Sequence, residues 1–249
     1  MTKLDIWCLV YHMSRSKHPA PPKVSLLPLE HPSRLADLAY TSLKETILNM
    51  DSTSEGRLDE RELAQSFKIS RTPLRDAINR LVSEGFLRVE PRKGVFIIRK
   101  TRQEIIEILY VRAALEGMAA KLAVRHITDQ DIANMKDIFS KFTQHNVVTL
   151  VDDFSAANVT FHEFVLKLSC CQKLQEMAGN IYDHMRMVRA TTIRLGNRAK
   201  NALADHLEII RAFEKRDGEL ASRHMQQHIE GLARYVEENR GLFPWGPLK

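Results

Sequence analysis

Three histidines and one asparagine in the C-terminal half are spaced so that they could hold a metal ion. Asn158 and His162 are four residues apart and therefore share one face of a helix. His206 lies about ten residues before the centre of the turn KRDGE, and His228 about eleven residues after it. In an antiparallel helical hairpin that rises about 1.5 Å per residue, these two histidines come level with each other. Three imidazoles and a carbonyl-type oxygen suit a divalent cation, so we expect Zn²⁺, with Ni²⁺ or Mn²⁺ as alternatives.

The sequence leaves alternatives to this ligand set. His224 lies four residues before His228 on the same helix face, so it competes with His228 as a ligand. A single buried histidine is more often a hydrogen-bonded core residue than a ligand, so the metal hypothesis depends on the whole set. Asn158 is neutral and is a weaker ligand than an aspartate would be.

A second group of polar residues lies on one face of the segment ISRTPLRDAINRL. Arg71, Arg75 and Asn79 recur every four residues and therefore project from the same side of a helix. Another face is apolar and carries Leu74, Ile78 and Leu81. Forked guanidinium groups and an amide suit base edges and phosphates better than a protein core. The alternative is a solvated face on which these arginines pair with Asp76 or Glu62.

The elements that must position these arginines have the order of a helix-turn-helix with a wing. Apolar periodicity predicts three helices, over about 33–50, 60–67 and 71–84. KIS is a tight connection before the third helix, and Gly85 ends that helix. Two short apolar segments, Phe86–Val89 and Val95–Arg99, flank the turn residues EPRKG and predict a β-hairpin.

In such a module the N-terminal part of the second helix of the motif enters the major groove. The two arginines could therefore make bidentate contacts with guanine. Ser70 and Thr72 could bind phosphates, helped by the helix N-terminus. Lys93 and Gly94 form the wing tip, where a residue without Cβ permits close approach to the DNA.

The rest of the chain reads as helices without strands. Thr101 and Glu104 form a capping box that begins a helix reaching about residue 124, and Thr128 with Asp131 begins another that reaches about residue 142. Four further helical patterns cover about 150–168, 172–194, 201–215 and 219–238. Six helices in this length predict an all-α bundle.

The expected fold class is therefore mainly α. It combines a winged helix-turn-helix domain over 33–100, with a small β-hairpin, and an all-helical bundle over 101–240. A proline-rich arm at 1–32 and a tail at 241–249 flank the two domains.

Composition and charge narrow the class of protein. The chain has 249 residues, 44% hydrophobic and 27% charged, with no apolar run near the ~20 residues that span a bilayer. The short apolar stretch Leu4–Tyr11 contains Asp5 and precedes no cleavage site, so we expect neither a signal peptide nor a membrane partner. Cys8, Cys170 and Cys171 form no C-x-x-C pair, which favours reduced thiols and a cytoplasmic location.

The net charge of +6 is unevenly placed. Residues 56–100 hold eleven Lys or Arg against six Asp or Glu, whereas residues 101–249 hold twenty against nineteen. A local basic surplus beside a nearly neutral domain favours a module that binds a polyanion such as double-stranded DNA. A solvated basic face remains the alternative on charge alone.

The segment GRLDERELAQSFKISRTPLRDAINRLVSEGFL, followed by PRKGVFI, resembles the winged helix-turn-helix of the GntR superfamily of bacterial transcription regulators. The downstream segments VRAALEGMAAKLA, NVTFHEFV, ADHLEIIRAFEKRDGELA and MQQHI resemble the all-helical ligand-binding (FCD) domain of its FadR branch. The resemblance covers about residues 35–238. It departs from the family pattern at Met50 and Glu55, where the family commonly has Gly and Pro, and at SCCQ.

The resemblance implies further roles. Arg61 matches a family position that also contacts DNA, and Arg112 matches a position that often faces the ligand pocket. Arg112 could clamp a carboxylate effector there, or it could instead pair with Glu116 one turn away. The same Asp/Asn-plus-three-His set that the spacing picks out holds a metal in many of these domains.

We therefore expect a ligand-responsive transcription regulator with no enzymatic activity. One recognition helix reads only a few base pairs, so we expect a homodimer on a palindromic operator. A metal-dependent hydrolase fits less well, because HMQQH lacks the glutamate of H-E-x-x-H. A nonspecific architectural DNA binder would leave the polar cluster in the bundle unexplained.

Overall fold

The computed structural model describes residues 33–49, 56–98, 100–192 and 198–239. The expectations for the arm, the tail, Arg99 and the departures at Met50 and Glu55 lie outside these residues. No helix within the described ranges is long and apolar enough to cross a membrane.

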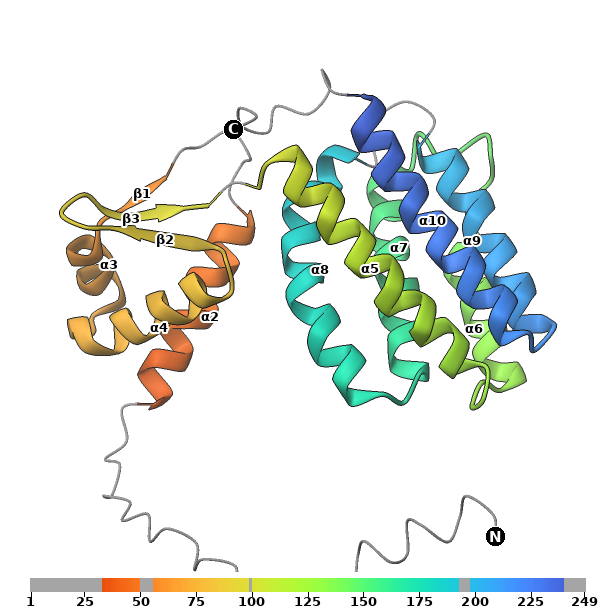
Figure 1. Cartoon of the computed structure of the whole chain (residues 1–249), viewed down its shortest axis with the longest axis horizontal. Coiled ribbons are helices and arrows are strands. Elements are labelled where there is room, and N and C mark those ends of the chain that lie inside the picture. The colour runs from red at the N-terminus through yellow and green to blue at the C-terminus, as the bar shows by residue number, and fades with distance from the viewer. Residues whose placement is uncertain (1–32, 50–55, 99, 193–197, 240–249) are drawn as a thin grey trace, which may run out of the picture. The chain divides into compact units, whose positions relative to one another are not determined.

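The first part of the described chain contains the three expected helices and the expected β-hairpin, together with a short strand between the first two helices that was not expected (Figure 1). Its helices are α2 (Ser33–Asn49), α3 (Glu60–Phe67) and α4 (Arg71–Ser83). Its strands are β1 (Arg57–Leu58), β2 (Leu87–Glu90) and β3 (Gly94–Ile97). The strand order is β1-β3-β2, and both pairs are antiparallel. The prediction of a two-stranded hairpin therefore missed one strand, β1, which pairs with the other edge of β3.

Local chemistry sets the ends of α3 and α4. The Asp59 carboxylate accepts hydrogen bonds from the backbone N–H groups of Arg61 and Glu62 and so caps α3. Lys68 ends α3 in the left-handed region, with φ of 54°. Gly85 follows α4 with φ of 79°, a conformation in which glycine has no steric cost. The predicted tight turn and glycine stop are both present.

The apolar faces of these elements meet in one core. Leu74, Ile78, Leu81 and Phe86 are all at most 2% exposed, and Leu63 packs at the margin. Burying each such side chain stabilises the fold by about 1.5–3 kcal/mol. Because the apolar face of α4 is buried in this core, the opposite face of α4 is turned toward solvent.

The second part of the described chain is an all-α bundle, as expected. Its six helices within residues 101–239 are α5 (Arg102–Ala123), α6 (Asp129–Phe139), α7 (Val151–Leu168), α8 (Gln172–Thr192), α9 (Arg198–Glu214) and α10 (Gly218–Glu238). Both predicted capping boxes, at Thr101 and Thr128, are formed. Helix α6 ends three residues earlier than predicted, and α9 begins three residues earlier.

Helices α5 and α10 pack closely along their lengths (Figure 1). A Cβ at Gly117 of α5 would lie 2.5 Å from the side chain of Gln226 on α10, so glycine permits this approach. The core of the bundle is apolar except for a small group of buried polar residues that includes Arg112, Glu116 and three histidines. A buried polar group is costly unless it is paired, so the partners of this group matter for function.

Candidate nucleic-acid interface and metal centre

Helix α4 presents polar residues to solvent. Arg71, Arg75 and Asn79 are all exposed, while Leu74 and Ile78 on another face are buried. This is the distribution that the four-residue spacing predicted. The exposed face could therefore contact a groove of DNA without disturbing the core.

Four arginines surround a shallow hollow of about 260 Å³ beside this face. Arg61, Arg71 and Arg75, which the sequence nominated, line it together with Gly94. Arg57 is the fourth arginine, and sequence reasoning missed it because strand β1 was not foreseen. Asp59 and Glu60 also line the hollow, so four positive charges outnumber two negative ones. The net positive charge suits a phosphate backbone.

The ion pair formed by Arg75 is an exposed one. Its Nε donates to Glu60 Oε2 at 3.1 Å, and 65% of the Arg75 side chain is exposed. The sequence had suggested Asp76 or Glu62 as partners, and neither is the observed one. An exposed pair contributes about 0–1 kcal/mol, so DNA could replace Glu60 at little cost.

Ser70 and Thr72 lie at the exposed beginning of α4. Ser70 is the N-cap residue, yet its hydroxyl makes no capping hydrogen bond. The first backbone N–H groups of a helix carry partial positive charge and attract anions. A phosphate contact at this position is compatible with the geometry.

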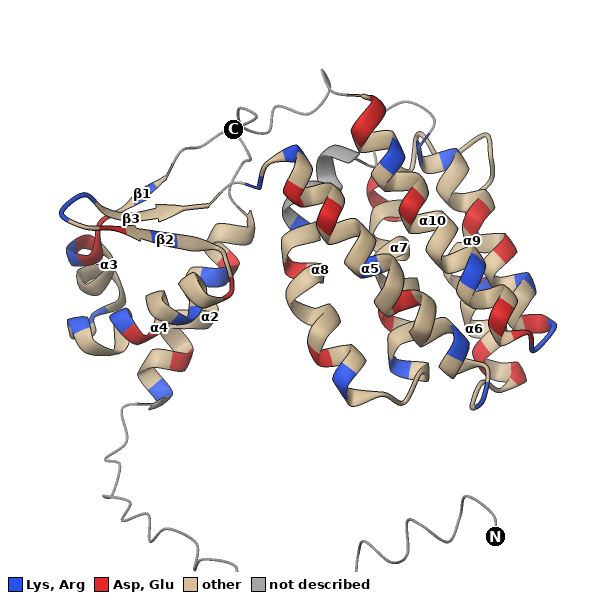
Figure 2. Cartoon of the chain, viewed as in Figure 1, with Lys and Arg blue, Asp and Glu red and all other residues tan. Residues whose placement is uncertain are grey.

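The wing tip carries basic residues, as Figure 2 shows at the turn between β2 and β3. Lys93 has 73% of its side chain exposed and pairs with Glu90 at 3.1 Å. Gly94 has φ of 115°, and a Cβ there would lie 3.2 Å from Arg57 Nε. The turn therefore favours glycine, whereas a Cβ would require the Arg57 side chain to move by only a few tenths of an ångström.

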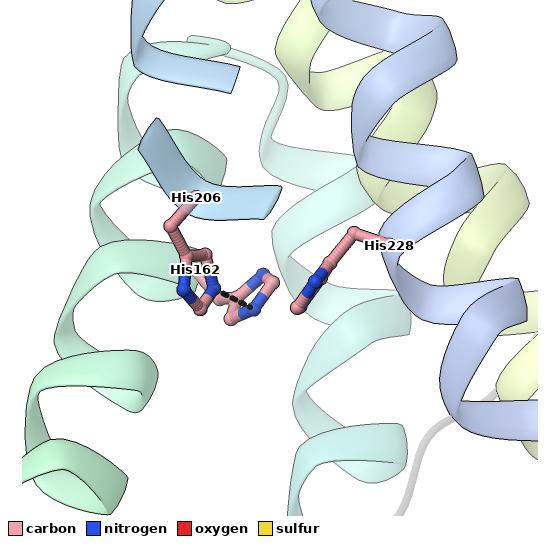
Figure 3. Close-up of side chains that lie close together, drawn as sticks. All are labelled: His162, His206 and His228. Carbon is pink, nitrogen blue, oxygen red and sulfur yellow. Dashed lines mark hydrogen bonds between the residues drawn. The ribbon is translucent and has the colours of Figure 1, made fainter. Parts of the chain in front are cut away.

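Three histidines meet in the interior of the helical bundle (Figure 3). His162 comes from α7, His206 from α9 and His228 from α10, and each is at most 5% exposed. One ring nitrogen from each lies within 4.8 Å of the others. The Nε2 atoms of His162 and His206 are 3.3 Å apart. The hairpin argument thus placed His206 and His228 correctly beside each other.

Two carboxylates hold two of these rings. Glu116 Oε2 accepts from His162 Nδ1 at 2.5 Å, and Asp205 Oδ2 accepts from His228 Nδ1 at 3.0 Å. The Nδ1 of His206 is buried and has no hydrogen-bond partner among the described residues. The ring of His206 instead stacks on Phe139, with centroids 4.7 Å apart. Sequence reasoning named neither carboxylate as a partner of a histidine.

Electrostatics keep the histidines neutral. Burial lowers the pKa of His162, and it lowers the pKa of His206 and His228 well below the usual value. Burial opposes the charge of Glu116, but Arg112 and His162 outweigh it and lower the Glu116 pKa to about 2. Partial burial instead raises the pKa of the Asp205 carboxyl. Neutral imidazoles supported by carboxylates are the form in which histidine binds metals.

This donor set fits a divalent transition metal. Imidazole nitrogens suit Zn²⁺ and Ni²⁺, and a hydrogen-bonded carboxylate commonly supports such a ligand. Asn158 is half-buried and lines the same cavity as His162 and His228. His224 is not part of the histidine cluster and lines a separate hollow beside Asp205.

A cavity of about 320 Å³ is lined by two of the three histidines, His162 and His228. Its polar lining includes Arg112 and Asn158, and also Arg186 and Arg198, which the sequence did not nominate. Its apolar lining consists of Val159, Met185, Ala202 and Leu232. Glu163 and Asp183 also line the cavity, so its charged lining consists of three arginines and two carboxylates. This lining suits a small molecule with an anionic group and an apolar part.

Arg112 forms the ion pair that the sequence offered as the alternative to effector binding. Its Nε donates to Glu116 Oε1 at 2.5 Å, and both side chains are buried. Its guanidinium also lies over the Tyr182 ring, 5.5 Å from the centroid. Arg112 therefore lines the cavity while its charge is already matched by Glu116.

Helix α8 lines this cavity and also contacts α2. Asp183 and Arg186 both line the cavity. Asp183 pairs with Lys44 of α2 at 2.7 Å, and Arg186 donates to Glu45 and Asn49 of α2 at 3.1 and 3.0 Å. One helix thus carries residues that contact both the cavity and the first helix of the winged module.

Comparison with known proteins agrees with this arrangement. Residues 35–97 match the family described as bacterial regulatory proteins, gntR family, and residues 107–231 match the FCD domain. The Nta operon transcriptional regulator of Aminobacter aminovorans is 33% identical over 133 residues, which are 53% of this chain and 63% of that protein. The uncharacterized HTH-type transcriptional regulator YdhC of Bacillus subtilis strain 168 is 27% identical over 166 residues, 66% of this chain and 74% of that one.

A solved structure has the same fold. It is that of McbR/YncC from E. coli, with a TM-score of 0.64 and 21% identity, and the match covers 83% of this chain and 98% of that one. The two family matches together span both the winged module and the bundle with its histidines. This chain therefore belongs to the GntR family of bacterial transcription regulators and carries an FCD domain.

Proposed function

We propose that this chain binds a palindromic operator as a homodimer and that a small carboxylate effector modulates this binding from a metal-containing helical domain. One observation carries the proposal. A single chain combines an exposed arginine face on α4 with a buried histidine cluster beside a cavity. The first suits DNA, and the second suits a small anionic ligand.

The DNA contacts divide by chemistry. Arg71 and Arg75 read guanine edges in the major groove from the start of α4. Ser70 and Thr72 bind phosphates, and Arg61 contacts DNA from α3. Lys93 and Gly94 bring the wing to the backbone or the minor groove. Gly94 is half-buried, and the other residues of this set are exposed. Their exposure and the net positive hollow beside them support this division.

We expect a homodimer because the recognition helix of one chain is too short to read a whole operator. One recognition helix contacts only a few base pairs, whereas a two-fold dimer reads two half-sites. We expect the helical domains to form most of the dimer contact. Sedimentation at micromolar concentration should give a dimer, and a monomer that binds operator one-to-one would contradict this part of the proposal.

The residues that would hold the metal are Asn158, His162, His206 and His228. When bound, a divalent ion such as Zn²⁺, Ni²⁺ or Mn²⁺ supplies a Lewis-acidic point at which an anionic group can dock. The three helices that carry these side chains are then joined at one point. Arg112 contributes a cationic wall, although its pairing with Glu116 limits its freedom to clamp the effector.

Control of DNA binding requires coupling between the cavity and the winged module. Helix α8 offers a route, because Asp183 and Arg186 line the cavity and also hold α2. An acid in the cavity that draws Arg186 inward would weaken its bonds to Glu45 and Asn49. A difference of about 1–3 kcal/mol between two arrangements of the dimer is sufficient.

Selection from random double-stranded DNA tests this function. The selected sequences should contain an inverted repeat, and binding to them should exceed binding to random DNA by about 10³-fold or more at physiological salt. A salt titration on both DNAs separates a regulator from an architectural binder. Equal affinity for selected and random DNA would contradict operator recognition.

A further inference from the structure

The three histidines of the cluster are held in two different ways. His162 and His228 each have a carboxylate at Nδ1, whereas His206 has none among the described residues and rests against Phe139 instead. An ionised carboxylate has no proton and can only accept a hydrogen bond. A hydrogen bond from Nδ1 to a carboxylate therefore places a proton on Nδ1 of His162 and on Nδ1 of His228.

This choice of proton position determines which nitrogen is free. A neutral imidazole has one N–H and one lone pair, so a proton on Nδ1 leaves the lone pair on Nε2. The Nε2 atom of His162 is the one that faces His206, at 3.3 Å. Nδ1 of His228 faces Asp205, which leaves its Nε2 for the cluster.

We propose that Glu116 and Asp205 are positioning residues of the metal centre, which turn the Nε2 lone pairs of His162 and His228 toward a shared point. The inference rests on the proposed metal site. It assigns a role to two carboxylates that would not touch the metal. Glu116 comes from α5 and Asp205 from α9, so each carboxylate reaches its histidine from another helix.

Replacement of the two carboxylates should affect folding stability to different extents. Glu116 is 1% exposed and also pairs with Arg112, so its replacement leaves a buried charge without a partner. The Asp205 side chain is 40% exposed, and its other charged neighbour, Arg198, lies 3.9 Å away. Asp205 therefore gives the decisive variant, and Glu116→Gln is a supporting one.

Replacement of Asp205 by asparagine has a specific expected consequence. The amide is nearly isosteric with the carboxylate, but its NH₂ group can donate to Nδ1. His228 can then carry its proton on Nε2, where it blocks the lone pair that the metal needs. Loss of such a supporting carboxylate typically lowers metal affinity by about 10–100-fold.

Glu208→Gln is the matched control. Glu208 lies on the same helix one turn from Asp205, lines the same hollow and pairs with Arg211 rather than with a histidine. This substitution removes the same charge from nearly the same place. It should therefore leave zinc affinity within about threefold of the native value, well short of the loss expected for a positioning residue.

The test is a zinc titration of the full chain in competition with a chromophoric chelator, combined with ¹⁵N NMR of the histidine side chains in the zinc-free protein. We expect Asp205→Asn to lower zinc affinity about 10–100-fold and to shift the His228 proton from Nδ1 toward Nε2. Native zinc affinity together with an unchanged His228 proton position in Asp205→Asn would overturn the inference. A native protein that takes up no zinc would overturn the proposed metal centre as well, so the two failures are distinguishable.

Discussion

The polar residues of the winged module and those of the helical bundle are held in opposite ways. Arg75 on α4 has one partner, Glu60, and 65% of its side chain is exposed. Arg112 on α5 pairs with Glu116, and their side chains are 10% and 1% exposed. Glu116 in turn holds His162, so three buried residues form a continuous network.

The exposed arginines of the winged module can exchange a protein partner for DNA, whereas the buried polar residues of the bundle keep their protein partners. An exposed ion pair has little net stability, so a phosphate or a base edge can replace the protein partner. A buried pair is costly to break, so its geometry is fixed before any ligand arrives.

Glu116→Gln should have the largest effect on stability. It leaves Arg112 buried without a counter-charge, which costs about 3–5 kcal/mol. Urea unfolding of the chain measures the loss. The matched exposed pair is Lys141 with Asp153, and Asp153→Asn should cost less than about 1 kcal/mol. Similar losses of unfolding free energy in the two variants would contradict the proposed difference between buried and exposed ion pairs.

His206→Ala and His228→Ala should each lower metal content and abolish the rise in melting temperature that zinc produces. A ligand that binds only the folded state stabilises it by about 2.7 kcal/mol at a concentration 100 times Kd. His224→Ala is the control, because His224 lies outside the cluster. Full metal content in His228→Ala with loss in His224→Ala would reassign the ligand.

Arg75→Ala should weaken binding to the selected operator by about 1–3 kcal/mol and relax the base preference at one position. The loss of the exposed pair with Glu60 should hardly alter folding stability. Fluorescence anisotropy on operator variants measures both affinity and preference. Unchanged affinity and preference would show that α4 does not read bases through this residue.

Lys93→Ala should have the smallest effect. Its side chain is 73% exposed at the wing tip, so we expect a contact with phosphate rather than with a base. Affinity should fall to a similar extent on all sequences, and the slope of log affinity against log salt should become shallower by about 1. A loss confined to one DNA sequence would instead indicate base reading by the wing.

Much of the fold could be predicted because the responsible residues are close in sequence. Capping boxes at Thr101 and Thr128 and the stop at Gly85 act within a few residues, and all three are present.

Helix α6 ends earlier than the apolar pattern predicted. Phe142 is buried although the helix ends at Phe139, so the apolar pattern continues beyond the helix.

The missed features depend on partners that are distant in sequence. Strand β1 has two residues, too few for a periodic pattern, and it pairs with Val95 and Phe96 far along the chain. Arg57 was missed together with this strand.

The histidines of the candidate metal site could be predicted from helix spacing, but the carboxylates that bind them could not. Spacing brought His206 and His228 together, but it could not indicate which carboxylates face their Nδ1 atoms. Glu116 is visible as an i+4 partner of Arg112, yet its bond to His162 spans 46 residues. Asp205 lies beside His206 in sequence but binds His228 instead.

Native mass spectrometry of the purified full chain tests dimerisation, metal binding and effector binding in one experiment, because it detects subunits, metal and retained small molecules together. We expect a dimer that carries one divalent ion per chain, with a bound small acid or with uptake of one from a panel of carboxylic acids. His228→Ala should remain dimeric but lack the ion. A native protein without metal after loading with Zn²⁺, Ni²⁺ and Mn²⁺, and with the same melting temperature as His228→Ala, would contradict the account.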